Sequence, residues 1–446
     1  MVSASPAEGI QPLSKIAIHK ATVDLHGSAY VRATPALLGD QYQYANYSAN
    51  YRYWGKGTIR FQIINQRSDF SFALFTGGFE NPKLVAVSKP VAFKNPKAPV
   101  FPRLAQGKTH DEMTTMSRNK RSSRVWFMVC FHFHPGEPAR TVGWRDPGFI
   151  HTAFMRDLWP NKEYTYKIGH ELSDGTMVSG KPYTFRAPPT PGQNSLQRII
   201  VFGDMGKAER DGSNEFANYQ PGSLNTTDTL VKDLDNYDIV FHIGDMPYAN
   251  GYLSQWDQFT AQVAPISARK PYMVASGNHE RDWPNTGGFF DVKDSGGECG
   301  VPAETMYYYP AENRANFWYK VDYGMFRFCV ADTGHDWREG TPQHKFIEEC
   351  LSTVDRKHQP WLIFAAHRVL GYSSNACYTT AIPRWSVFRD QDYGFVKLTA
   401  FNHSSLLFEY KKSSDGNVYD SFTVDRDYRN VLSCVHDSCF PTTLAL

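Results

Sequence analysis

Apolar and polar residues alternate over short stretches in the first part of the chain. The alternation is clear in residues 58–64 and again in residues 70–75. A period of two residues is typical of half-buried strands. Residues 159–169 and 181–186 continue the pattern with many aromatic side chains, which suits a β-sandwich. The sequence therefore predicts strands, and no dominant helices, before residue 187.

The pattern changes after a stiff, polar linker. Residues 187–195 read Ala-Pro-Pro-Thr-Pro-Gly-Gln-Asn-Ser, which marks a domain boundary. Beyond the linker, apolar runs typical of strands alternate with stretches typical of helices. The predicted strands are 198–203, 238–243, 271–275, 326–331 and 360–365, and the predicted helices are 227–234 and 344–354. This alternation predicts a layered α/β domain.

Four of the apolar runs lead directly into a residue that can bind a metal. These residues are Asp204, Asp245, Asn278 and His367, and Tyr248 follows shortly after Asp245. A single Gly-Asp pair is usually a turn, and a single histidine after a strand is usually structural. Here, however, the carboxyl ends of several strands are expected to meet at one edge of the sheet. Carboxylates, an amide oxygen, an imidazole and a phenolate suit a hard trivalent ion beside a divalent one.

The motifs around these residues resemble those of a known family. They read Gly203-Asp-Met-Gly206, Gly244-Asp-Met-Pro-Tyr248, Gly277-Asn-His-Glu280 and Ala365-Ala-His367. In this order they resemble four of the five signature blocks of purple acid phosphatases, especially the large plant members. The resemblance implies a fold class of α+β and α/β domains. A fibronectin-III-like β-sandwich region is followed by a four-layer αββα metallophosphoesterase domain, here incomplete.

The resemblance and the linker together divide the chain into four parts. Residues 1–98 form a β-rich region and residues 99–190 the β-sandwich of the family. Residues 196–390 form a truncated metallophosphoesterase domain, and residues 391–446 form the carboxyl-terminal segment of the family.

The resemblance also implies a role for each candidate metal ligand. Asp204 and Tyr248 would bind Fe(III), Asp245 would bridge the two metals, and Asn278 and His367 would bind Zn(II), Mn(II) or Fe(II). The implied function is that of a metal-dependent acid phosphatase that hydrolyses phosphate esters. A nucleotide pyrophosphatase/phosphodiesterase is an alternative on the same fold.

His279, next to Asn278, is implied as the catalytic residue that faces the phosphate group. The phosphate ester is then the expected partner, and a homodimer is the expected assembly.

The fifth signature block, Gly-His-x-His, is absent. In the family it supplies one more histidine to each metal, but only His403 and His436 follow His367 here, and neither has that context. The interval from His367 to Asp392 is too short for the helix, strand and loop expected there. An inactive or impaired splice or gene-model variant, acting at most as a binding module, is therefore a second hypothesis. Abrupt changes near Asp40, in residues 117–134 and at Asn375 indicate further junctions.

Residues 116–124 place four basic side chains together before an apolar run. We interpret this stretch as a solvated loop or as sequence outside the native reading frame, because a short charge run is usually solvated. Beyond it, His132 and His134 have the spacing of two ligands on one strand face. No carboxylate or cysteine cluster accompanies them, so we interpret the pair as structural.

Composition limits the partners and the compartment. The net charge of +2 gives no basic footprint for nucleic acid. No apolar run approaches the roughly 20 residues that cross a bilayer, so no membrane span is predicted. The start of the chain shows no signal peptide. The family resemblance and the sequons at Asn46, Asn225 and Asn402 favour a secreted glycoprotein.

Seven cysteines are present without a CxxC pair or zinc-finger spacing. Cys329 is predicted to be a buried thiol within a strand, whereas Cys434 and Cys439 have the spacing of a small disulfide. The odd total leaves at least one thiol unpaired.

Overall fold

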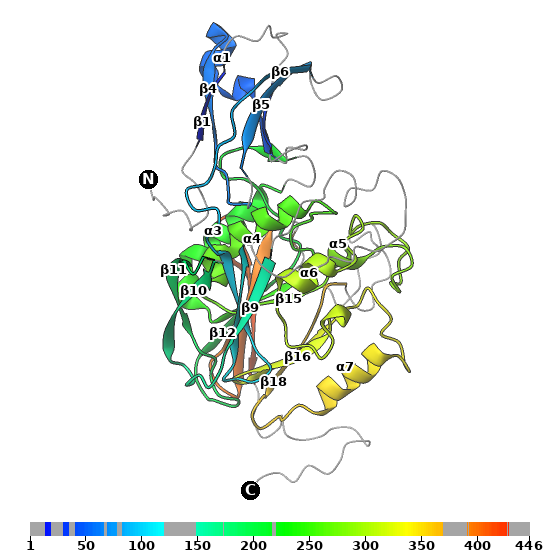
Figure 1. Cartoon of the computed structure of the whole chain (residues 1–446). Helices are drawn as coiled ribbons and strands as arrows, with labels where there is room; N and C mark the ends of the chain where they lie inside the picture. Colours follow the sequence, from blue (N-terminus) through cyan, green and yellow to red (C-terminus); the bar gives the residue numbers. More distant parts are fainter. Residues whose placement is uncertain are drawn as a thin grey trace.

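The structure is a computed structural model in which a small amino-terminal part stands on a larger body (Figure 1). It describes residues 14–18, 30–34, 41–66, 69–77, 83–119, 149–172, 174–215, 220–368, 390, 392–425 and 427. Helices α3 (Gly222–Lys232) and α4 (Leu253–Ser267) lie at the top of the body, below the amino-terminal strands (Figure 1).

The amino-terminal part consists of short strands around an aromatic core. Its elements are β1 (Ser14–Ile18), β2 (Tyr30–Thr34), β3 (Gln41–Tyr44), η1 (Ala45–Tyr47), α1 (Ala49–Trp54), β4 (Gly57–Phe61), β5 (Ser71–Thr76) and β6 (Lys83–Val87). Strands β3, β2, β5 and β6 lie side by side in that order, and β1 pairs with β4. The rings of Phe61 and Phe72 are 5.7 Å apart between centroids, and those of Phe70 and Phe93 are 5.8 Å apart. The strands predicted within residues 58–64 and 70–75 are therefore present as β4 and β5.

Five longer strands follow along the chain and belong to the larger body (Figure 1). They are β7 (Val100–Gln106), β8 (Met113–Asn119), β9 (Phe149–Met155), β10 (Glu163–Glu171) and β11 (Met177–Arg186). The first three form one antiparallel sheet, and β10 and β11 form a hairpin. Val100 and Phe101 share an apolar cluster with Ala261 and Ala264 of α4. Strand β7 therefore packs directly on the body.

The prediction for residues 116–124 is wrong for the residues that the structure describes. Met116 and Arg118 lie within β8 and are buried, and the guanidinium of Arg118 forms an ion pair with the carboxylate of Asp257 in α4. Their side chains are 1% and 0% exposed. A buried guanidinium is stable only beside a compensating charge, so Asp257 on a distant helix is what allows this arginine to be buried. The charge pattern of the local sequence did not contain that information.

The body contains two packed sheets with helices on their outer faces. Its remaining elements are β12 (Gln197–Phe202), β13 (Asn214–Glu215), η2 (Leu234–Asn236), β14 (Ile239–Ile243), β15 (Tyr272–Ala275), α5 (Asn278–Arg281), α6 (Val301–Met306), η3 (Arg314–Asn316), β16 (Tyr319–Tyr323), β17 (Phe326–Ala331), α7 (Pro342–Ser352), β18 (Trp361–Ala366), β19 (Gly394–Ala400), β20 (Ser405–Lys412) and β21 (Val418–Asp425). One sheet has the strand order β15-β14-β12-β19-β20-β21, and the other has the order β16-β17-β18. Within the described residues, β18 is an edge strand.

Aromatic side chains join the two sheets. Phe241 of β14 stacks on Phe328 of β17 with ring centroids 4.1 Å apart, and the Tyr319 hydroxyl donates to the Val274 carbonyl oxygen at 2.9 Å. On the outer faces, α3 hydrogen-bonds to the end of β20 through Thr226 and Ser413, and α7 covers the smaller sheet (Figure 1). The layers therefore run helix, sheet, sheet, helix.

Helix α4 was not predicted from the sequence. Of its residues, only Gln262 and Pro265 are not buried. The sequence did carry a signal for it, because the apolar residues Leu253, Trp256, Phe259, Val263 and Ile266 recur at helical spacing. The residues of its polar face are buried as well, which the local pattern does not reveal. Some of its polar residues are bonded inside the protein: Asp257 forms an ion pair with Arg118, and the Thr260 hydroxyl donates to the Trp256 carbonyl oxygen at 2.9 Å.

The prediction of a free thiol at Cys329 is wrong. Cys329 is buried in β17 as expected, but it forms a disulfide with Cys350 of α7. The bond ties the covering helix to the sheet below it. Cys299 is also disulfide-bonded.

Several predictions concern residues outside the described part of the chain. They are those for His132 and His134, for Cys434 and Cys439, for His436 and for the changes at Asp40 and Asn375. Among the helices that are described, none is both long and apolar enough to cross a membrane.

Asp257→Asn should destabilise the protein by about 3–5 kcal/mol, because it leaves the buried Arg118 charge without compensation. The matched control is Asp228→Asn in the Arg210–Asp228 pair, whose side chains are each 44% exposed. That change should cost at most about 1 kcal/mol. Urea unfolding followed by circular dichroism measures both; equal losses would contradict the importance of the buried pair.

Candidate metal site

The candidate site lies where four strands end. Asp204 follows β12, Asp245 follows β14, Asn278 follows β15, and His367 follows β18. Strands β12, β14 and β15 are mutually parallel neighbours, so their carboxyl ends share one edge of the larger sheet. β18 belongs to the smaller sheet and brings His367 to the same place.

The backbone at this edge adopts a conformation that side chains rarely tolerate. Asp204, Asp245 and Tyr248 have φ angles of 55°, 51° and 52°, in the left-handed region. Such geometry persists only where surrounding contacts enforce it, and it concentrates at functional sites. One enforcing contact is the hydrogen bond from the Asp204 amide to the Gly244 carbonyl oxygen, at 3.1 Å.

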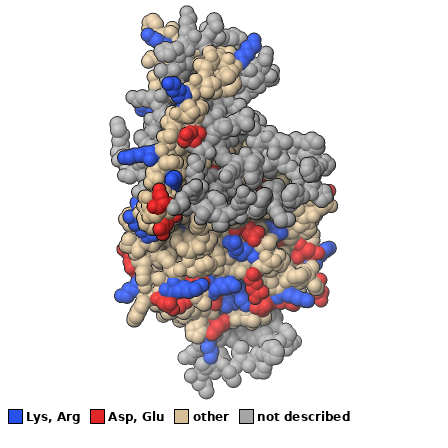
Figure 2. Space-filling view, viewed as in Figure 1, with Lys and Arg blue, Asp and Glu red and all other residues tan. Residues whose placement is uncertain are grey.

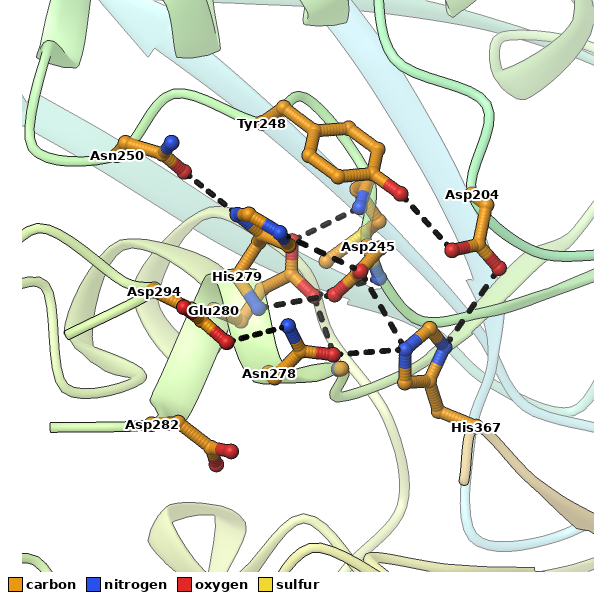
Figure 3. A network of polar contacts seen from close by, with 12 residues as sticks. Asp204, Asp245, Tyr248, Asn250, Asn278, His279, Glu280, Asp282, Asp294 and His367 are labelled. Atoms are coloured by element: carbon orange, nitrogen blue, oxygen red, sulfur yellow. Dashed lines mark hydrogen bonds and ion pairs between the residues drawn. The ribbon is translucent and has the colours of Figure 1, made fainter. Parts of the chain in front are cut away.

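The five predicted ligands come together (Figure 3). One donor atom each from Asp204, Asp245 and His367 lies within 4.8 Å of the other two. The Tyr248 hydroxyl donates to Asp204 Oδ1 at 2.8 Å, and His367 Nε2 is 3.2 Å from Asn278 Oδ1. His367 Nε2 also lies 3.4 Å from Asp245 Oδ2. The donors thus form one connected cluster.

The cluster is electrostatically coupled. Burial acts to lower the pKa of His367, but its hydrogen bond with Asp245 and the Asp245 and Asp204 charges raise this pKa to about 9. Burial acts to raise the pKa of Asp245, but the hydrogen bond and charge of His367 outweigh it and hold this pKa below its ordinary value. Burial and the two carboxylates raise the pKa of Tyr248. A bound cation would compensate the charges of Asp204 and Asp245 in place of the proton on His367.

Glu280 is a functional residue that the sequence reasoning missed. Its buried carboxylate accepts from the amides of Asp245, Met246 and Gly277 at 2.8, 2.8 and 2.9 Å. Burial and the Asp245 charge raise the pKa of Glu280 to about 8. The sequence did carry a signal for it, because a glutamate three residues after a helix cap can return to the cap backbone. Glu280 thereby fixes the loops after β14 and β15 relative to each other.

Two glycines permit this close approach of the loops. A Cβ atom on Gly277 would lie 2.1 Å from Asp245 Oδ1, and one on Gly244 would lie 2.7 Å from the Gly277 nitrogen. Neither space admits a side chain. The site therefore depends on glycine at both positions, as the Gly-Asp and Gly-Asn motifs suggested.

His279 lies beside the cluster with a fixed orientation. Its Nδ1 is 2.8 Å from Asn250 Oδ1, its ring is 4.3 Å from the Tyr248 ring, and its Nε2 is 4.0 Å from Asp245 Oδ2. Because the Asn250 oxygen is an acceptor, Nδ1 carries the proton and Nε2 faces the cluster. Asn250 was not predicted, since no sequence motif marks it.

Asn278 is held in place by a residue that the sequence reasoning did not predict, Asp294. Asn278 Nδ2 donates to Asp294 Oδ2 at 2.8 Å, which turns Oδ1 toward His367 (Figure 3). The amide is therefore held in the orientation that a metal ligand requires.

Other candidate residues lie away from this cluster. His403 Nε2 is 3.0 Å from the carbonyl oxygen of Gly192, at the domain linker. Asn46 lies in η1, Asn225 on α3, and Asn402 in the turn before β20. Their glycosylation stays a prediction.

The residues that are present fit a hard cation. Two carboxylates, one of them 62% exposed, stand with an imidazole, an amide oxygen and a phenol around one small volume. Such a cation would neutralise the charges of Asp204 and Asp245, which protonated His367 neutralises in its place. The Gly-His-x-His histidines, which the family resemblance would add to each metal, are absent from the sequence.

Comparison with protein-family models gives two matches. Residues 14–95 match the Fn3-like domain from purple acid phosphatase. Residues 352–421 match the carboxyl-terminal domain of iron/zinc purple acid phosphatase-like proteins.

Two relatives are similar over much of the chain. "Probable inactive purple acid phosphatase 27" of Arabidopsis thaliana is 55% identical, with 91% of this chain and 82% of that protein covered. The alignment runs over 501 positions, more than the 446 residues of this chain, so that relative carries segments that this chain lacks. "Nucleotide pyrophosphatase/phosphodiesterase" of Hordeum vulgare is 71% identical over 61% of this chain and 95% of that protein.

A solved structure matches the whole fold. Purple acid phosphatase PPD1 from yellow lupin seeds is 48% identical, with 94% of each chain covered and a TM-score of 0.86. The predicted fold class is confirmed: a fibronectin-III-like amino-terminal domain precedes a metallophosphoesterase fold.

Binding of Mn(II) at this cluster should tighten with pH by up to about tenfold per unit below pH 9, because His367 must lose its proton to become a ligand. Titration calorimetry in buffers of different ionisation enthalpy measures the affinity and the released proton. His403→Ala, remote from the cluster, should keep the same slope. A slope of zero in the unmodified protein would show that His367 is not a ligand.

Proposed function

Because this chain belongs to the purple acid phosphatase family, we propose that it is a metal-dependent hydrolase of phosphate esters. The observation that carries the proposal is the convergence of Asp204, Asp245 and His367, whose donor atoms lie within 4.8 Å of one another. Family membership supports the phosphatase class. The cluster supports a metal as the cofactor.

In the proposed site, five residues share two metals. Asp204 and Tyr248 would hold Fe(III), Asn278 and His367 would hold Zn(II), Mn(II) or Fe(II), and Asp245 would be shared by both metals. Such a metal pair, when bound, supplies Lewis-acid stabilisation of phosphoryl charge and an activated water. The assignment is supported by the hydrogen bond between Tyr248 and Asp204 and by the contact between Asn278 and His367.

His279 is proposed to face the phosphate group. Asn250 holds its Nδ1 proton, so Nε2 is the atom available to the substrate. The Tyr248 ring supports one side of the imidazole. When it is protonated, His279 binds and orients a phosphoryl oxygen through its Nε2–H, or gives that proton to the leaving group.

A secreted location is also proposed. A buried disulfide such as that between Cys329 and Cys350 forms readily in an oxidising compartment and is uncommon in the cytosol.

On the face shown in Figure 2, acidic and basic side chains are interspersed over the described residues. This distribution supports a small ester substrate rather than nucleic acid as the partner.

A second candidate function is that of a non-catalytic binding module. The observation that favours it is the absence of Gly-His-x-His, which leaves each proposed metal one histidine short. The 55% identical relative from Arabidopsis thaliana is named "probable inactive". Removal of a residue that hydrogen-bonds a metal ligand lowers metal affinity by roughly 10–100-fold, and removal of a ligand itself lowers it more.

Metal analysis and a p-nitrophenyl phosphate assay on the same preparation separate the two functions. If the chain is an enzyme, it should bind two metals, and Asp245→Asn should reduce turnover by more than about 100-fold. Asp228→Asn, an equal change of charge outside the site, should leave turnover unchanged. Less than one bound metal together with no turnover would establish the non-catalytic function.

Substrate preference decides between two hydrolases. The name of the barley relative supports a nucleotide pyrophosphatase/phosphodiesterase as the alternative. If that alternative holds, bis(p-nitrophenyl) phosphate should be cleaved faster than p-nitrophenyl phosphate by the same preparation. The opposite ratio would support a monoesterase.

A further inference from the structure

The segment from Asp204 to Glu215 joins the candidate site to the amino-terminal domain. It starts at a proposed metal ligand and ends as strand β13. β13 pairs antiparallel with β3, with Asn214 opposite Tyr42 and Glu215 opposite Gln41. The body thus contributes the edge strand of the amino-terminal sheet, whose order is β13-β3-β2-β5-β6.

Gln43 of β3 fastens this segment from the amino-terminal side. Its side-chain amide lies 3.1 Å from Ser213 Oγ, 3.4 Å from the Asp211 carbonyl oxygen and 2.7 Å from the Arg60 carbonyl oxygen. Gln43 is 5% exposed and Ser213 is 0% exposed. Water therefore cannot replace these bonds at low cost.

Asp211 adds a second connection. Its carboxylate accepts from the Gln62 amide at 2.5 Å and from the Ser213 amide at 2.9 Å. The first bond crosses to the amino-terminal domain, and the second shapes the segment itself. One carboxylate thereby links the segment to the end of β4.

The other half of the segment is fixed to the body. The Gly206 amide donates to the Met246 carbonyl oxygen at 2.9 Å, and the Ala208 amide donates to Gln262 Oε1 of α4 at 3.0 Å. Lys207, between them, is fully buried. The segment is therefore held at both ends, by the body near Asp204 and by the amino-terminal domain near β13.

We infer that the amino-terminal domain positions Asp204, and that Gln43 is the positioning residue through which it does so. Asp204 is 62% exposed and has a left-handed backbone, and its side chain accepts a hydrogen bond from the Tyr248 hydroxyl at 2.8 Å. Its geometry depends on the chain that leads away from it. The amino-terminal domain is then part of the site, although it contributes none of the proposed ligands.

Gln43→Ala tests this inference. Hydrogen–deuterium exchange of the amides of residues 204–213 should accelerate by about tenfold or more, because the segment loses its anchor on β3. The control is Phe93→Leu, which weakens the amino-terminal core without touching the segment. It should accelerate exchange in the amino-terminal strands only. Unchanged exchange in residues 204–213, or equal acceleration by both variants, would overturn the inference.

Ser213→Ala removes the same hydrogen bond from the other side and should give the same result if Gln43→Ala does not fold.

Mn(II) affinity is the second measurement. It should fall by roughly 10-fold in Gln43→Ala relative to Phe93→Leu, as when a partner of a ligand is lost. This measurement rests on the proposed function. If the unmodified protein binds no metal, the proposed function fails, whereas hydrogen exchange still decides the role of Gln43.

Discussion

The arrangement of the site depends on three backbone N–H groups that share one buried carboxylate. Glu280 accepts from Asp245, Met246 and Gly277, and it thereby joins the loops that follow two neighbouring parallel strands. Without an acceptor, each of those buried donors would cost about 1–3 kcal/mol. The strained backbone at Asp245 is tolerable only because this network compensates for it. The proposed metal ligands thus depend on main-chain hydrogen bonds for their positions.

Much of this architecture could be predicted from local patterns. The strands β12, β14, β15, β17 and β18, and the proposed ligands after four of them, follow from apolar runs that stop at polar residues, because a buried strand and its exposed end differ in composition. What could not be predicted depends on distant partners. Arg118 became a buried residue through Asp257, Cys329 became half of a disulfide through Cys350, and Asn250 meets His279 only in the folded chain. Helix α4 was missed although its apolar residues recur at helical spacing, and the burial of its polar face depends on packing that the local sequence does not contain.

The separation between family membership and catalysis has a structural basis. The ligands from β12, β14 and β15 are supported by one intact sheet, and this support does not require the Gly-His-x-His block. His367, in contrast, follows β18, which is an edge strand within the described residues. A missing segment beyond β18 therefore removes ligands and strand neighbours together, while the larger sheet keeps its geometry. The larger sheet therefore preserves the framework of the candidate site whether or not the chain is catalytic.

The pairing of β8 with β9 bears on the unusual sequence between them. Asn119 lies opposite Phe149 and Arg118 opposite Ile150, so the two ends of residues 120–148 are held side by side by the sheet. The entropy lost on closing a connection grows only with the logarithm of its length, by about 0.6 kcal/mol for each doubling. A replacement or change of length between these strands is therefore thermodynamically inexpensive. Mutation or altered splicing can therefore change the sequence between β8 and β9 without loss of the surrounding fold.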